Sequence, residues 1–258
     1  MTRRYELLRS DDGGFMRRLC LTFVVGAAIV LTGSCGQFGH LAEVHYRISV
    51  GIDTPEGLRA GAGVWSYELR RGNIDQGFTS RFQGEAIPID LPNGKTIFAL
   101  LDLRGPDNLP VLDIQGRLPE LVTARRFFPS GSFPPPAGIS RPEIIKYIQK
   151  HVHNRVKLNC NPEPYPGECP LLVSFRNPAD PNSVYALDPD NLEAEFGPGY
   201  ALRGMFLQVT DAHPTHQLEG RLPWEASVGG KHLDGSDVNR PTTLASHLTI
   251  LSFKKWQR

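Results

Sequence analysis

The sequence predicts a mainly β protein, in which an antiparallel, sandwich-like β domain is followed by a smaller α+β domain. Three observations lead to this fold class. Apolar and polar residues alternate along short runs between residues 40 and 103, which is the period of a half-buried strand. Glycine and proline separate these runs, and a helical spacing of apolar residues appears only after residue 140. The 258-residue chain is 40% hydrophobic and 21% charged, a composition typical of a folded soluble protein.

The predicted β domain covers residues 40–125. Alternation over residues 44–50 and 64–69 predicts two strands, and the turn-forming residues 53–57 lie between them. The phase of the alternation then changes between residues 78 and 91, close to Pro88. Because proline cannot donate a ladder hydrogen bond, we expect a bulge or an edge-strand corner at this point.

A hairpin turn and a helix start carry the clearest local signals. Residues 92–95, Pro-Asn-Gly-Lys, predict a hairpin turn that leads into the apolar run 96–103, which is suited to a central strand. Proline-rich residues 126–140 predict a linker to an α+β domain over residues 141–258. A Ser-x-x-Glu capping box at the end of this linker predicts the start of a helix. The other elements expected in the second domain are strands at 171–175, 184–187, 201–210 and 248–253, and a brief helix at 191–196.

An export signal is predicted at the N-terminus. Residues 19–31 contain no charge and directly follow Arg17 and Arg18. A helix of this length is about 20 Å long, which is short of the roughly 30 Å hydrocarbon layer. We therefore favour a cleaved signal over an uncleaved anchor or a buried helix. Translation is expected to start at Met16, because two arginines follow it at once, as in an orthodox signal.

The signal ends in a candidate lipid attachment site. Residues 31–35, Leu-Thr-Gly-Ser-Cys, resemble a bacterial lipobox, in which Cys35 would accept the lipid. The leucine stands four positions before the cysteine instead of three, so ordinary signal-peptidase cleavage near Ser34 stays open. Gly36 mildly favours the outer membrane. We expect residues 1–35 to be a leader and the mature protein to be a periplasm-facing cell-envelope protein, whose partner is the membrane that holds its lipid.

Two cysteines, Cys160 and Cys169, are left in the exported part. An even pair in an oxidising compartment predicts a disulfide, and the three prolines and one glycine between them favour a turn. The alternative is a zinc site that adds His151 and His153. The eight-residue gap argues against it, since zinc knuckles separate their cysteines by two to four residues.

Charge and motifs exclude several function classes. With 28 basic and 27 acidic residues and a net charge of +1, the chain has no field that would attract nucleic acid. The sequence has neither a Gly-x-Ser-x-Gly elbow nor a phosphate-binding glycine loop, and we expect no cofactor. The most suggestive polar cluster is Asp211, His213 and His216, which could bind a metal; a solvated loop with incidental histidines is the competing interpretation.

Three stretches of the chain, residues 84–101, 185–199 and 221–224, are similar to a group of uncharacterised exported proteins of proteobacteria. The resemblance covers strands, turns and caps, and it implies a compartment but no activity. We therefore expect a lipid-anchored envelope protein that is a non-catalytic structural or binding module. A metal-dependent envelope hydrolase that uses the Asp211 cluster is the alternative. A sugar- or peptide-stacking surface would use the three tryptophans, Trp65, Trp224 and Trp256, unless these are core residues.

Overall fold

The described part of the chain forms a two-sheet β structure. Within Leu41–Arg258, which makes up one compact unit, the paired strands are antiparallel, and the predicted mainly β fold class is confirmed. The predicted leader with Met16 and Cys35, and the predicted linker apart from Ser140, lie outside the described residues. The computed structural model describes residues 39–72, 77–111, 140–151, 154–161, 167–237 and 241–256.

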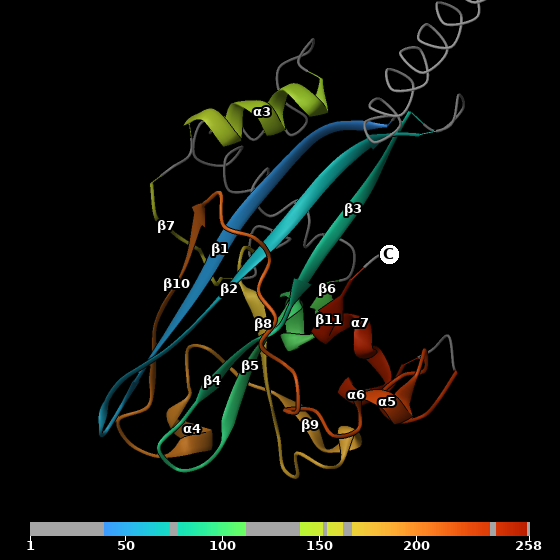
Figure 1. Cartoon of the computed structure of the whole chain (residues 1–258). Helices are drawn as coiled ribbons and strands as arrows, with labels where there is room; N and C mark the ends of the chain where they lie inside the picture. Colours follow the sequence, from blue (N-terminus) through green and yellow to red (C-terminus); the bar gives the residue numbers. More distant parts are fainter. Residues whose placement is uncertain are drawn as a thin grey trace, which may run out of the picture. The chain divides into compact units, whose positions relative to one another are not determined.

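In these ranges, six strands form the first sheet, in the order β11-β3-β2-β1-β10-β7 (Figure 1). Its two longest strands, β1 (His40–Thr54) and β2 (Gly57–Arg71), are joined by a turn at Pro55 and Glu56. This hairpin confirms the two strands predicted from alternation. The other strands of the sheet are β3 (Phe78–Glu85), β7 (Val156–Lys157), β10 (Ala201–Val209) and β11 (Lys254–Lys255).

The second sheet has the order β4-β5-β8-β9, with β6 beside β5. Asp90 pairs with Thr96, which confirms the predicted hairpin turn between them. The chain leaves the first sheet at Glu85 and enters the second as β4, an edge strand that contains Pro88, as the change of phase predicts. The strands of this sheet are β4 (Ile87–Asp90), β5 (Thr96–Arg104), β6 (Pro110–Val111), β8 (Pro170–Phe175) and β9 (Val184–Ala186).

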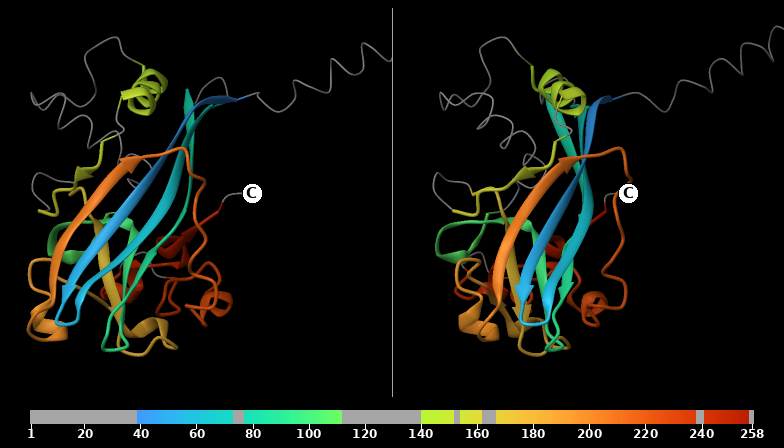
Figure 2. Two further views of the ribbon diagram at one scale, coloured as in Figure 1. Left: turned by 60° about the vertical axis from the view of Figure 1, so that its left-hand side comes forward. Right: turned by 90° about the vertical axis from the view of Figure 1, so that its left-hand side faces the viewer.

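The main core lies between the two sheets (Figure 2). Every second residue of β1, from Ala42 to Ile52, is buried, because alternate side chains of a strand point to the same face. Each buried isoleucine or valine of this row contributes about 1.5–3 kcal/mol. Trp65 of β2 is fully buried in the same core, and its indole Nε1 donates a hydrogen bond to the carbonyl of Glu85 at 2.8 Å.

A second core covers the other face of the second sheet. Phe98 of β5 and Phe175 of β8 pack there against Trp224 and Phe253 from the C-terminal part of the chain. β5 is therefore buried on both faces, which explains its unbroken apolar run and confirms the predicted central strand.

The helices are short, and one of them replaces a predicted strand. α3 (Arg141–His151) begins at the predicted capping box, where the Glu143 carboxylate accepts hydrogen bonds from the N–H and hydroxyl of Ser140. The prediction of a strand at 248–253 is wrong, because Thr249 and Ser252 form a capping box that starts a helix. The remaining helices are α4 (Glu193–Phe196), α5 (Glu225–Val228), α6 (Leu244–His247), α7 (Ile250–Phe253) and the 3-10 turns η1 (Pro106–Asn108) and η3 (Pro181–Ser183).

Strands from both halves of the chain share both sheets. β10 pairs with β1, and β8 pairs with β5. The expected boundary at the linker therefore does not divide a β domain of residues 40–125 from an α+β domain of residues 141–258. The apolar pattern of a strand indicates which of its faces is buried, but it does not indicate which strand lies beside it.

Candidate functional site

A pocket of about 370 Å³ lies at the end of the second sheet, where β5 begins and β8 ends. Its volume is within the range of small-molecule sites, about 300–1,000 Å³. Three segments that are far apart in the sequence form its walls: the turn before β5, the end of β8 with the following loop, and one arginine of the C-terminal part. The lining residues are Asn93, Gly94, Lys95, Thr96, Phe98, Ser174, Phe175, Arg176, Pro178 and Arg221.

The wall formed by the turn is held in place by hydrogen bonds. Gly94 has a φ of 78°, a left-handed conformation that a glycine adopts without strain. The side-chain Oδ1 of Asn93 accepts a hydrogen bond from the N–H of Lys95 at 3.1 Å. Ser174 of β8 donates its hydroxyl to the carbonyl of Thr96 at 2.9 Å, which fixes the turn against the neighbouring strand. The pocket thus has a rigid backbone frame.

Glu195 of α4 holds two of the three cations of the pocket. Its carboxylate accepts hydrogen bonds from Lys95 Nζ at 3.2 Å, from the Tyr185 hydroxyl at 2.8 Å and from both terminal nitrogens of Arg176. The guanidinium of Arg176 also lies over the Tyr185 ring, 3.8 Å from its centroid. Burial raises the pKa of Glu195, but the hydrogen bonds outweigh it and keep the pKa below its usual value. The carboxylate is therefore ionised at neutral pH.

Asp90 holds the third cation. Arg221 donates from Nη1 and Nη2 to the two carboxylate oxygens of Asp90, at 2.8 and 3.0 Å. Such a two-bond pair fixes the plane of the guanidinium as well as its position. The hydrogen bonds from Arg221 lower the pKa of Asp90, against the opposing effect of burial, and the hydroxyl of Thr96 lowers it further.

The floor of the pocket is apolar. Phe98 and Phe175 pack edge to face, with ring centroids 5.8 Å apart, and both rings belong to the second core. The lining residues of the pocket include no histidine, cysteine or carboxylate. The arrangement can bind a small molecule between an apolar floor and a cationic rim.

The predicted cluster of Asp211, His213 and His216 is spread along a segment that follows β10. His213 lies near His45, with ring centroids 6.1 Å apart, whereas His216 stacks on Trp256 at 4.0 Å. Among the described residues, no three His, Cys, Asp or Glu side chains are grouped so that they could hold a metal ion. The metal-dependent hydrolase stays a prediction, which elemental analysis of the purified protein would test.

The end of this segment contacts a buried carboxylate, Glu85, which is the last residue of β3. One oxygen of Glu85 accepts hydrogen bonds from the backbone N–H groups of Gln217 and Leu218, at 2.6 and 2.9 Å, and the other accepts from Trp256 Nε1 at 3.0 Å. His216 Nδ1 lies 3.4 Å from Oε1 of Glu85, the oxygen that accepts the hydrogen bond from Trp256. Burial raises the pKa of Glu85, but these hydrogen bonds lower it below the usual value. Glu85 therefore anchors two C-terminal segments to the end of β3.

The three tryptophans do not form one exposed surface. Trp65 and Trp224 are core residues, 0% and 4% exposed, and they belong to the two different cores. Only Trp256 is partly exposed, and it stacks on His216. The structure therefore favours the interpretation of Trp65 and Trp224 as core residues.

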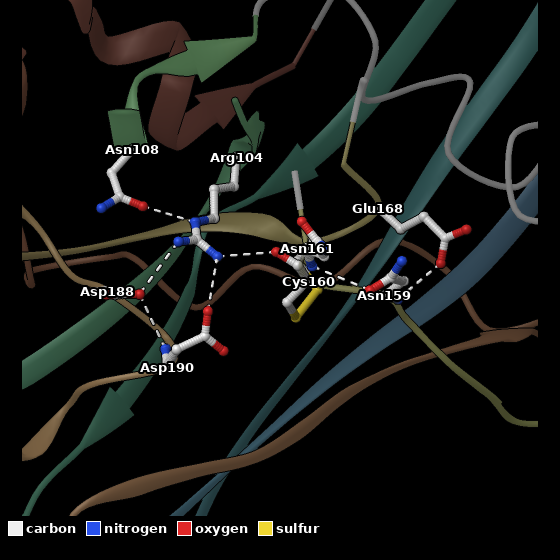
Figure 3. Close-up of a disulfide and its surroundings, with 9 residues drawn as sticks. Arg104, Asn108, Asn159, Cys160, Asn161, Glu168, Asp188 and Asp190 are labelled. Carbon is white, nitrogen blue, oxygen red and sulfur yellow. Dashed lines mark hydrogen bonds and ion pairs between the residues drawn. A yellow bond between two sulfur atoms is a disulfide. The ribbon is translucent and has the colours of Figure 1, made fainter. Parts of the chain in front are cut away.

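The predicted disulfide between Cys160 and Cys169 is confirmed, with Cα atoms 4.9 Å apart. Both sulfurs are consumed by the bond, so the alternative zinc site, which needs free thiolates, is not formed. Figure 3 shows Arg104 beside the bond: its Nη1 donates to the carbonyl of Cys160 at 2.9 Å. The backbone N–H of Arg104 donates to the carbonyl of Cys169 at 2.8 Å. Nε and Nη2 of Arg104 reach Asn108 and Asp188, so this arginine ties the disulfide loop to the second sheet.

Sequence reasoning found one wall of the pocket but not the pocket. The hairpin turn before Lys95 was predicted, but Arg176 and Arg221 carry no local signal and come together with it only through the strand pairing. In the part of the chain that the structure describes, no helix is long and apolar enough to span a membrane. Comparison with protein-family models, with curated proteins and with solved structures finds no match for this chain.

Proposed function

We propose that the protein is a lipid-anchored cell-envelope protein that acts as a non-catalytic binding module, with the pocket at the end of the second sheet as its ligand site. The observation that carries the binding role is the pocket itself, in which three cations line a rigid, partly apolar cavity. Its only hydroxyl groups are those of Ser174 and Thr96, and each donates to an acceptor of the protein. The lining residues include no histidine, cysteine or carboxylate, and the one lysine, Lys95, donates to Glu195, which supports binding rather than catalysis.

The location in the envelope is supported by the sequence of the leader and by the thiol chemistry. An uncharged stretch between Arg18 and Cys35 is typical of an export signal with a lipobox. The bond between Cys160 and Cys169 suits an oxidising compartment such as the periplasm. The resemblance to exported proteins of proteobacteria points the same way.

Fragment binding detected by amide NMR tests the binding role. The probes are a panel of neutral, cationic and anionic fragments of equal size, added to the purified protein. We expect at least one charge class to shift the amide signals of Gly94 and Ser174 and to leave those of β1 unchanged. If no class shifts these two signals, or if every shift is spread over the whole protein, the pocket is not the ligand site.

Cell fractionation tests the anchor. We expect Cys35→Ala to move the protein from the membrane fraction to the soluble periplasm, since one lipid-bearing cysteine would decide its retention. Cys20→Ala is the matched control, because Cys20 lies in the apolar stretch of the leader and is no lipid acceptor. Retention of the Cys35 variant in the membrane would contradict lipidation.

A further inference from the structure

The cations of the pocket line the cavity, and their counter-ions do not. Lys95, Arg176 and Arg221 line the pocket, whereas their partners Glu195 and Asp90 are not lining residues. The two carboxylates therefore hold the cationic groups without lining the cavity themselves. A ligand in the cavity would meet the positive groups first.

Both arginines keep donors for a ligand. In the described part of the chain, Arg176 and Arg221 each donate two of their five N–H groups, in both cases to one carboxylate. The remaining N–H groups of a planar guanidinium are arranged to match the oxygens of a carboxylate or a phosphate. Lys95 adds a third cation, and it shares the carboxylate of Glu195 with Arg176.

The charge balance of these groups favours an anion. Three cations and two carboxylates leave one positive charge uncompensated among these five groups, and only the three cations line the cavity. The ring stacking of Arg176 on Tyr185 and the two-bond pair of Arg221 with Asp90 fix the guanidinium groups before a ligand arrives. Groups that are already ordered lose little conformational entropy on binding.

We propose that the pocket binds a small organic anion, in which one carboxylate or phosphate group faces Arg176 and Arg221 and a compact body rests on Phe98 and Phe175. This inference rests on the proposed function and narrows it to one class of ligand. Cationic ligands are disfavoured by the three like charges at the rim, and neutral ligands would leave the open N–H groups without a charged partner.

A set of hexoses with one body and different charge tests the proposal. Glucose, glucuronate and glucose 6-phosphate are titrated into the purified protein, with acetate and inorganic phosphate as bare anions, and the amide signals of Gly94 and Ser174 are followed. We expect glucuronate or glucose 6-phosphate to bind at least about tenfold more tightly than glucose, since hydrogen bonds to a charged group are about twice as strong as neutral ones. The preference should weaken as salt is added. Glucuronate and glucose 6-phosphate then distinguish a carboxylate ligand from a phosphate ligand.

Two substitutions of opposite sign separate binding from a purely structural role. Arg221→Gln should weaken binding of the preferred anion by about tenfold. Asp90→Asn should tighten it by a few fold, because it removes a negative charge near the bound anion, while the amide oxygen of asparagine can still accept a hydrogen bond from Arg221. Arg203→Gln is the matched control: Arg203 makes the same kind of exposed ion pair, with Asp53, away from the pocket, and should not change binding.

Each outcome decides between the two proposals. If glucose shifts the pocket signals as strongly as glucuronate does, the binding role stands and the anion inference is overturned. If Arg221→Gln and Asp90→Asn weaken binding equally, the ion pair only holds the wall of the pocket, and the anion inference is again overturned. If none of the five probes shifts Gly94 or Ser174, the anion inference fails, and the fragment panel decides the binding role.

Discussion

Replacing Glu85 by glutamine should cost far more than an ordinary surface substitution. Glu85 is 2% exposed and accepts three hydrogen bonds, from the N–H groups of Gln217 and Leu218 and from Trp256 Nε1. Glutamine keeps one acceptor oxygen, which can serve the two backbone groups. Its NH₂ group then faces the indole N–H of Trp256, and two donors oppose each other.

The expected magnitude follows from this count. A hydrogen bond to a charged group contributes about 1.5–3 kcal/mol, and a neutral one about 0.5–1.5 kcal/mol. The variant loses one charged hydrogen bond and replaces two others by neutral ones. We expect Glu85→Gln to lower the free energy of unfolding by about 3.5–6 kcal/mol, which urea titration at neutral pH would measure.

The same substitution predicts a pH dependence with a definite sign. The pKa of Glu85 is lowered in the folded state, so the unfolded state binds its proton more readily. The stabilisation is fully present above the unfolded pKa, about 4.3, and is lost as the pH falls through the folded pKa. The difference between the wild type and Glu85→Gln should therefore stay constant from neutral pH to about pH 5 and shrink below about pH 4.

Glu225→Gln is the control for this experiment. Glu225 accepts a hydrogen bond from Lys254 at 2.9 Å, and Lys254 also lies 4.0 Å from Glu85. The side chains of Lys254 and Glu225 are each one-third exposed, so the loss of the ion pair between them should cost no more than about 1 kcal/mol. A cost for Glu85→Gln that is as small as that for Glu225→Gln would refute the role of Glu85 as a buried anchor.

Two further predictions concern the disulfide and a close backbone approach. The double variant Cys160→Ala, Cys169→Ala should lose about 2–3 kcal/mol in urea unfolding, the chain-entropy value for so short a loop, and an unchanged midpoint would contradict it. A Cβ at Gly84 would lie 2.6 Å from Cδ1 of the buried Trp65, so Gly84→Ala should cost about 1–3 kcal/mol. Gly230→Ala, in open space, should change stability by less than about 0.5 kcal/mol, and equal effects of the two glycine variants would contradict the predicted clash.

Local signals in the sequence predicted the elements whose structure is decided locally. The alternation along β1 appears in the structure as one buried face, and the Asn-Gly turn joins β4 to β5. The apolar run of β5 predicted a central strand, and the structure shows it buried on both faces. In each case, a period of two or a turn residue reports directly on the burial or conformation of its own segment.

The errors arose where two signals competed or where the information lies elsewhere in the chain. Residues 248–253 have apolar residues that suit a strand, but the capping box of Thr249 and Ser252 forms a helix instead. The interleaving of the two halves in both sheets depends on which strands pair, and so does the meeting of Lys95, Arg176 and Arg221. No pattern within a single segment reports on such pairing.

A crystal structure of the protein grown with glucuronate or glucose 6-phosphate, whichever binds more tightly in the titration, would test the central claim most directly. We expect the sugar ring to lie over Phe98 and Phe175, with the carboxylate or phosphate within hydrogen-bond distance of Arg176 or Arg221. An empty pocket at a saturating concentration, or a sugar bound with its anionic group turned away from both arginines, would contradict the account.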